Sequence, residues 1–272
     1  MSSKPSIFKK ILALLLVLAV CCAILFAMAF YGNPVSWFLA KQTATEYLEE
    51  NYNTSDYSIE RVYYNFKFGC YEAYVVSPSS IDSSFCITLG MDGRFLYDSY
   101  ESDVLNKGNV VRRIDNDYHN ATKTFLESAD FSYLIDIGYG EICFAYENRP
   151  DDTSVASYAI PVAELVLDAT YNTSEMGKRA GHLVIYVKED TPSVERLSEI
   201  LLDIRQKMDA AGIGFVSIDC ILQSFDEGNT ERIEVMEFAY ADIYEENLVE
   251  RVREANDAAR AYWEEMDKEK GI

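Results

Sequence analysis

One apolar segment near the start of the chain constrains the fold more than any other feature. Residues 11–30 contain no charged side chain, and Lys4, Lys9 and Lys10 come before them. About 20 residues of α-helix cross the hydrocarbon core of a bilayer, which is roughly 30 Å thick. We therefore expect residues 11–31 to form a transmembrane anchor in contact with the lipid bilayer, and the rest of the chain to fold separately from it.

The same segment also has features of a secretory signal peptide. Ala27-Met28-Ala29 fits the small-x-small pattern at which signal peptides are cleaved. Leu18-Ala19-Val20-Cys21 is a looser match to a lipoprotein acylation site. The apolar core of a signal peptide is usually about 7–15 residues long, so the length of this segment favours an uncleaved anchor. Under all three alternatives the chain after residue 30 leaves the cytoplasm.

Lysines are distributed unevenly about this segment. Three precede it, and the first basic residue after it is Lys41. Because positively charged flanks stay in the cytoplasm, we expect residues 1–10 to be a cytoplasmic tail. The protein is then a single-pass protein of the cell membrane with its C-terminal bulk outside. Gly32-Asn33-Pro34 ends the first helix, and Asn33 and Pro34 are suited to cap and begin a second one.

The remainder of the chain is strongly acidic. All 45 Asp and Glu residues and 21 of the 24 Lys and Arg residues follow residue 30, which leaves a net charge of −24 on that part. Such a surface repels polyanions, so we expect no nucleic-acid partner. The two histidines, His119 and His182, have no metal-binding spacing, and we expect both to be structural. The sequence predicts no metal and no cofactor.

Four cysteines lie outside the apolar segment, at Cys70, Cys86, Cys143 and Cys220. Their even number and the expected extracytoplasmic setting allow two disulfides. A bridge between Cys70 and Cys86 on neighbouring strands is less favoured than buried free thiols, because neighbouring strands need not place the two directly opposite. The sequence leaves the redox state of all four cysteines open.

The pattern of residues 33–130 predicts an α+β module. A helix at 36–52 comes first, and a helix at 109–128 with apolar residues three and four apart comes last. Between them we expect a four-stranded antiparallel sheet, whose strands lie at 57–67, 71–76, 85–89 and 94–97.

The pattern of residues 140–272 predicts a second, ferredoxin-like α+β module. A strand at 181–188 precedes a helix that begins near Pro192. A hairpin and a last helix from about Tyr244 follow. We expect the boundary between the modules at 130–140, where the periodicity lapses.

Aromatic residues are concentrated on the first two predicted strands. Because side chains alternate between the faces of a strand, one aromatic face belongs to the core. The other face is either covered by a helix or available to a partner. The loop from Ser77 to Asp82 is the most polar connection between strands. The candidate partner-binding residues are therefore Tyr64, Phe66, Phe68, Tyr71, Tyr74, Ser79 and Asp82.

No constellation of residues predicts catalysis. A Gly-x-Ser-x-Gly motif is absent, and paired acids are too common in so acidic a chain to mark a site. We expect a non-catalytic binding or regulatory module with a protein partner in the cell envelope. The alternatives are a carboxylate-based hydrolase of cell-wall material that uses Asp82, Asp92 and Asp98, and a sensor of divalent cations.

Several short stretches together resemble a known family. They are Asn33-Pro34 after the apolar segment, Tyr47 and Tyr52 on the first helix, Tyr64 to Gly69, and Ser77 to Phe85. These stretches are similar to the YfjL-like group of membrane-anchored proteins of Gram-positive bacteria. The resemblance is clearest over residues 30–130 and continues at Gly181 to Tyr186. It implies a bacterial cell-surface setting and carries over no activity and no catalytic residue.

Overall fold

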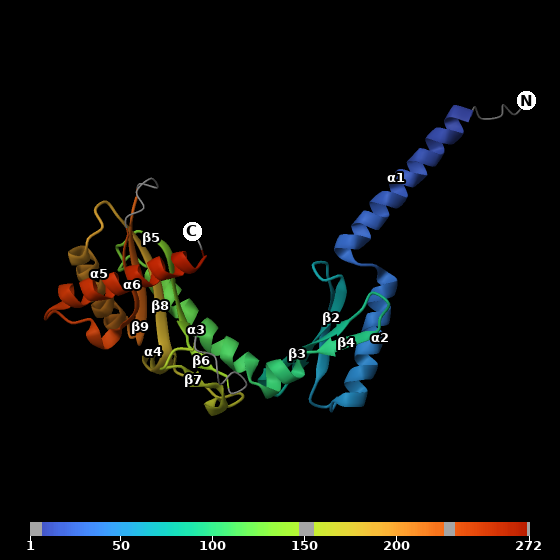
Figure 1. The fold of residues 1–272 in the computed structure, drawn as a ribbon. Coiled ribbons are helices and arrows are strands. Elements are labelled where there is room, and N and C mark those ends of the chain that lie inside the picture. Colours follow the sequence, from blue (N-terminus) through green and yellow to red (C-terminus); the bar gives the residue numbers. More distant parts are fainter. Residues whose placement is uncertain (1–6, 147–154, 226–231, 271–272) are drawn as a thin grey trace, which may run out of the picture. The chain divides into compact units, whose positions relative to one another are not determined.

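The chain forms an apolar helix and two α+β units (Figure 1). The computed structural model describes residues 7–146, 155–225 and 232–270. The first unit comprises residues 1–109 and the second comprises residues 110–272. The α+β class and the four-stranded antiparallel sheet expected near the N-terminus are confirmed. Residues 1–6, the larger part of the expected tail, lie outside the described residues.

Helix α1 (Ile7–Tyr31) contains the apolar segment. It has 25 residues, which at 1.5 Å per residue is about 37 Å, long enough to cross the hydrocarbon core of a bilayer. Its apolar side chains are exposed, as Leu14 is to 68%. Length and composition therefore fit a single membrane span, although a signal sequence near an N-terminus meets the same criteria.

Two residues connect α1 to helix α2 (Pro34–Asn51). Gly32 has a φ of +72°, in the left-handed region that favours glycine. The Asn33 side chain accepts a hydrogen bond from the Ser36 N–H at 2.8 Å and so caps α2 as expected. The Asn33 N–H donates to the Tyr71 hydroxyl at 2.8 Å, and this hydroxyl donates to the Asn33 C=O at 2.9 Å. The start of α2 is therefore bonded directly to the sheet.

Helix α2 covers one face of the first sheet. The four strands are antiparallel and adjacent in chain order: β1 (Ser58–Asn65), β2 (Cys70–Ser77), β3 (Ser80–Leu89) and β4 (Phe95–Asp98). The buried stripe of α2 has one residue every four positions and is mostly small: Ser36, Ala40, Ala44 and Leu48. Large side chains of the sheet fill the space beneath it, namely Tyr71, Val75, Phe85, Ile87 and Leu89.

Helix α3 (Gly108–Leu126) packs in the second unit, whereas the sequence pattern placed it with the first. Its buried residues Val110, Ile114 and Tyr118 belong to the core of the second unit, and the Tyr118 O–H donates to the Gly214 C=O at 2.8 Å. The units therefore divide between residues 109 and 110 instead of at 130–140. The physical reason is that an amphipathic helix belongs to the unit that buries its apolar stripe.

A four-stranded mixed sheet forms the second unit. Its strands are β5 (Ile135–Ile142), β8 (Gly181–Glu189), β9 (Ser217–Ser224) and β10 (Arg232–Ala239). Their order in the sheet is β10-β9-β8-β5, in which β8 and β9 are parallel and both outer pairs are antiparallel. The expected strand–helix–strand–strand–helix order is present as β8, α5 (Val194–Ala211), β9, β10 and α6 (Leu248–Lys270).

Shorter elements complete the fold. Helix α4 (Thr173–Ala180) precedes β8, and β6 (Phe144–Ala145) pairs in parallel with β7 (Ile160–Pro161). Single turns of π- or 3₁₀-helix occur at Glu101–Leu105, Val162–Glu164 and Tyr240–Asp242.

The second sheet has a core face and an opposite face. Alternate strand residues, such as Ile185 and Cys220, enter one core with buried apolar residues of α3, α4, α5 and α6. Burying an isoleucine such as Ile185 completely stabilises the fold by about 1.5–3 kcal/mol. The residues between them, including His182 and Asp219, point to the opposite face.

We expect Gly32→Ala to destabilise the first unit more than Gly69→Ala. Both glycines have positive φ, at +72° and +63°, which costs an alanine about 1–2 kcal/mol. At Gly32 a Cβ would also lie 2.4 Å from the Tyr71 hydroxyl and 2.9 Å from Cγ of Tyr64, whereas at Gly69 it would meet nothing within 4 Å. Thermal unfolding of the full-length protein in detergent micelles measures the difference, and equal midpoints for the two variants would contradict this account of the junction.

Candidate functional site

The face of the first sheet that points away from α2 carries polar aromatic side chains. The strand register places Arg61 opposite Tyr74 and Tyr63 opposite Glu72. Tyr97 lies on the same face, because it pairs with Thr88, which in turn pairs with Glu72. We refer to Arg61, Tyr63, Glu72, Tyr74 and Tyr97 as the tyrosine face. Its most accessible ring is that of Tyr97, which is 60% exposed.

Charge and hydrogen bonds connect the members of the tyrosine face. The Arg61 guanidinium lies 5.5 Å from the centre of the Tyr63 ring and 5.3 Å from that of Tyr74. Glu72 accepts hydrogen bonds from the Tyr63 O–H and, at 2.7 Å, from the Asn65 amide. Burial and the hydrogen bond to Glu72 raise the pKa of Tyr63, so it stays a neutral phenol. These groups suit recognition by stacking and hydrogen bonding.

The residues predicted from sequence do not form one surface. Tyr74 belongs to the tyrosine face. Phe66 and Phe68 are exposed in the turn between β1 and β2, and Ser79 is exposed in the turn between β2 and β3. The structure therefore separates the accessible candidates into three locations.

Two of the predicted partner residues, Tyr71 and Asp82, are only 1% exposed. Tyr71 pairs with Tyr64, and both point to the α2 side of the sheet, where Tyr71 bonds to Asn33. The backbone C=O of Asp82 accepts a hydrogen bond from the Asn109 side chain at 2.8 Å. The phase of the strand alternation buries Tyr71 beneath α2. Asp82 lies on the other face of β3 and is buried near Asn109, so neither side chain is accessible to a partner.

The acids of the hydrolase alternative are spread along β3. Asp82 is near its start, Asp98 is opposite Ile87, and Asp92 lies in the turn after its end. Ile87, which lies opposite Asp98, is five positions along β3 from Asp82, a separation of about 16 Å. This exceeds the roughly 5–10 Å between the two catalytic acids of a glycosidase. These three carboxylates therefore do not converge on one catalytic centre.

Asp98 and Asp92 also have partners of their own. Asp98 accepts hydrogen bonds from the Tyr47 O–H at 2.6 Å and the Tyr52 O–H at 2.9 Å. Asp92 forms an ion pair with Arg94 at 3.6 Å on the exposed turn. The hydrogen bonds of Asp98 join the end of β4 to α2, so its role is structural.

All six cysteines are free thiols. Cys86 pairs with Tyr74, which is four residues along β2 from Cys70, so the two cysteines are too far apart for a disulfide. Burial raises the pKa of Cys70 and of Cys86. Both are therefore poor nucleophiles at neutral pH.

On the opposite face of the second sheet, His182 of β8 lies between two carboxylates. Its Nδ1 is 3.1 Å from Oε1 of Glu141 on β5. Its Nε2 is 3.2 Å from Oδ1 of Asp219 on β9, without the alignment of a hydrogen bond, so this contact is an ion pair. Asp219 also accepts a hydrogen bond from the Glu237 N–H of β10 at 2.6 Å. The cluster thus connects all four strands of the sheet.

The charge of His182 determines what this cluster can do. Burial alone would lower the pKa of His182, but Asp219 and Glu141 outweigh it and raise the pKa to about 9. At neutral pH the ring is an imidazolium, which cannot act as a general base. The nearby Ser217 hydroxyl is hydrogen-bonded to Tyr158 at 2.8 Å, and burial raises the pKa of the Cys143 thiol. The arrangement fits a structural ion pair better than a nucleophile with its base.

The sequence pattern does not connect His182 with Glu141 or Asp219. The sequence shows which side chains alternate along each strand, but it does not show which residues of neighbouring strands lie opposite each other. β9 joins β8 only through the helical crossover α5, and β5 comes from a distant part of the chain. Within the three described ranges of the chain, no group of three or more His, Cys, Asp or Glu side chains could hold a metal ion.

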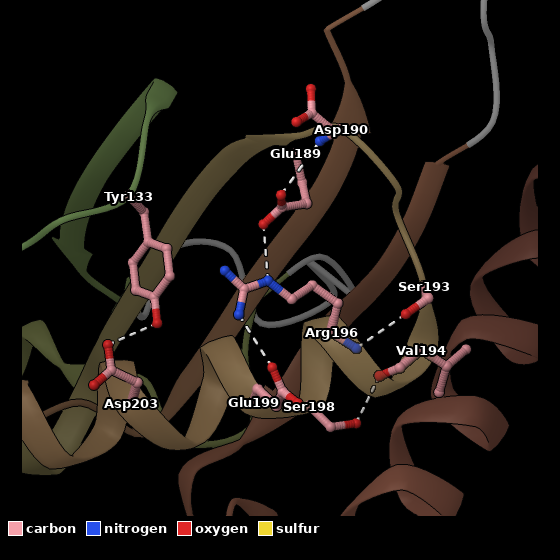
Figure 2. A network of polar contacts seen from close by, with 9 residues as sticks. All are labelled: Tyr133, Glu189, Asp190, Ser193, Val194, Arg196, Ser198, Glu199 and Asp203. Carbon is pink, nitrogen blue, oxygen red and sulfur yellow. Dashed lines mark hydrogen bonds and ion pairs between the residues drawn. The ribbon is translucent and has the colours of Figure 1, made fainter.

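A separate polar network fixes the start of α5 (Figure 2). The Ser193 hydroxyl accepts a hydrogen bond from the Arg196 N–H at 3.1 Å, so α5 begins just after the expected start at Pro192. Figure 2 shows the Arg196 side chain extended toward Glu189 at the end of β8, to which it donates at 2.8 Å. The Tyr133 O–H donates to Asp203 on α5 at 2.7 Å. The network joins α5 to the sheet.

We expect the stability of the second unit to fall as the pH rises from about 6.5 to 9. The pKa of His182 is about 9 in the folded state and about 6.5 in an unfolded chain. The stabilisation from its protonated form is therefore complete below pH 6.5 and is lost as the pH rises through 9. Because Glu141 is half exposed, we expect the loss to be about 1–3 kcal/mol.

Urea unfolding of the full-length protein at several pH values measures this loss. His182→Gln should remove the slope between pH 6.5 and 9, whereas His119→Gln on α3 should retain it. A slope that survives in His182→Gln would assign the pH dependence to other groups.

Models of known families match most of the chain. The model of the YfjL-like N-terminal domain matches residues 7–103, and that of the YfjL-like C-terminal domain matches residues 117–253. The first match lies within the first compact unit and the second lies within the other. Comparison with curated proteins and with solved structures found no match. On the strength of the two domain matches, this chain belongs to the YfjL-like family.

Proposed function

We propose that this protein is a single-pass, membrane-tethered protein of the cell envelope whose folded units lie outside the cytoplasm. We propose further that it is a binding or regulatory module and not a catalyst. The observation that carries the proposal is the junction of α1 and α2. Only Gly32 and Asn33 separate the apolar helix from a helix that is packed on the first sheet. An uncleaved α1 would therefore hold the first unit at the membrane surface.

The distribution of charge supports this orientation. Lysines precede the apolar segment of α1, as on the cytoplasmic side of membrane proteins. The part after it has a net charge of −24, which favours solubility in an aqueous compartment and disfavours contact with polyanions.

The tyrosine face supports a binding function. It combines an exposed ring at Tyr97 with the stacked pair of Arg61 and Tyr63. Tyrosine and arginine are enriched at the energetic centres of protein interfaces, because they offer a large contact area together with hydrogen bonds. We propose that a protein of the envelope binds this face, with no cofactor. The hydrolase alternative has less support, since Asp82, Asp92 and Asp98 are spread along β3.

We expect proteinase K added to intact spheroplasts to degrade both folded units while an epitope tag at the N-terminus stays protected. A cytoplasmic protein of the same cells should survive and serves as the control. The mass of the purified protein then separates anchor from signal peptide, because cleavage after Ala29 would remove the tag. Protection of the folded units would contradict the proposed orientation.

We expect a photo-crosslinking amino acid in place of Tyr97 to form a discrete adduct with an envelope protein in living cells. The matched control is the same substitution at Tyr262, which is 50% exposed on α6. In the Tyr97 variant, Arg61→Ala should reduce the yield of the adduct, because it removes the cation of the tyrosine face. No adduct from Tyr97, or the same adduct from both positions, would contradict a binding role for this face.

A further inference from the structure

The turn between β1 and β2 exposes two large aromatic side chains. It comprises Phe66, Lys67, Phe68 and Gly69, and the two phenylalanines are 64% and 72% exposed. Tight turns usually present small or polar residues, which form turn hydrogen bonds and face water without cost. Two phenylalanines in one turn therefore call for an apolar environment that covers them.

This turn lies beside the end of the apolar helix (Figure 1). The ring of Phe66 is 6.1 Å from that of Phe30, in the last turn of α1. Tyr64 and Tyr71, on the two strands that the turn joins, surround Gly32. The surface of the turn is thus continuous with the apolar surface of α1.

The two ends of the first sheet differ in chemistry. At the end near α1, the β1–β2 turn contains no acid, and α2 has no acidic residue before Glu46. The neighbouring β3–β4 turn has one acid, Asp92, which is paired with Arg94. At the far end, the β2–β3 turn is polar, and Ser77 and Ser79 lie in hydrogen-bond contact there.

Basic residues accompany the aromatic residues at the end near α1. The Lys67 ammonium lies 5.6 Å from the centre of the Phe68 ring, and that of Lys41 lies 5.3 Å from the Trp37 ring. Aromatic rings with adjacent lysines are typical of the boundary between headgroups and acyl chains, where the rings are buried and the ammonium groups reach outward.

We infer that the β1–β2 turn is a second membrane contact, in which Phe66 and Phe68 enter the headgroup–acyl boundary of the bilayer that α1 crosses. This inference rests on the proposed function, because it requires α1 to remain as a span. A single helix can tilt in the bilayer and carry the first unit with it, whereas a second contact at the bilayer surface restricts this tilt. The turn would therefore determine the direction in which the tyrosine face is presented.

Tryptophan fluorescence of the full-length protein in vesicles tests the inference. The vesicles contain phosphatidylcholine and phosphatidylglycerol, either plain or brominated near the headgroup end of the acyl chains. The test variant is Phe68→Trp. The matched control is Ile81→Trp, since Ile81 is 71% exposed near the polar β2–β3 turn of the same sheet. The native tryptophans give the baseline that is subtracted from both.

We expect the emission added by Phe68→Trp to fall roughly twofold or more in brominated vesicles, because interfacial side chains lie about 5–10 Å deep. The emission added by Ile81→Trp should be unchanged. Equal quenching of the two variants would overturn the inference. Absence of quenching in both would overturn it too, and is also the result expected if a protein partner, and not lipid, covers the turn.

Extraction of the same vesicles with alkaline carbonate separates the two proposals. Retention of the protein in the membrane pellet without quenching at position 68 would contradict only the second contact. Release into the supernatant would contradict the span itself.

Discussion

The Tyr71 hydroxyl bonds to both backbone polar groups of Asn33, and the organisation of the first unit depends on this contact. It holds the start of α2 against β2 and satisfies two backbone groups where one helix ends and the next begins. Gly32 makes the contact possible, because any side chain there would collide with Tyr71. A connection of two residues, one of them bonded to the sheet, thus joins the apolar helix to the first unit.

The two sides of the first sheet have different surroundings because α2 covers only one of them. The α2 side is a core built from small helix residues and large sheet residues. The other side is the tyrosine face, and the turn beside α1 carries the exposed phenylalanines. In our proposals, the membrane holds one end of the unit and a protein partner binds its tyrosine face. The connection and the β1–β2 turn together would then set the orientation of that face relative to the membrane.

Local patterns in the sequence predicted local elements well. The Asn33 cap, α2, the four strands of the first sheet and most elements of the second unit are confirmed, because each depends on neighbours in the chain. Predictions that depended on contacts between residues far apart in the sequence were less successful. Tyr71 and Asp82 were predicted at a binding surface, but both side chains are buried. The apolar stripe of α3 could pack against either unit. The sequence pattern assigned α3 to the first unit, but its stripe is buried in the core of the second.

The sequence alone was enough to establish the apolar helix, its lysine asymmetry, the acidic charge of the remainder and the α+β class. These follow from composition and from periodicity over a few residues. The three-dimensional fold was needed to establish the unit boundary, the residues of the tyrosine face, and the contact of His182 with Glu141 and Asp219. Each of these depends on the register between strands or on which core buries a helix. That register is set by packing across the whole unit, which no local pattern contains.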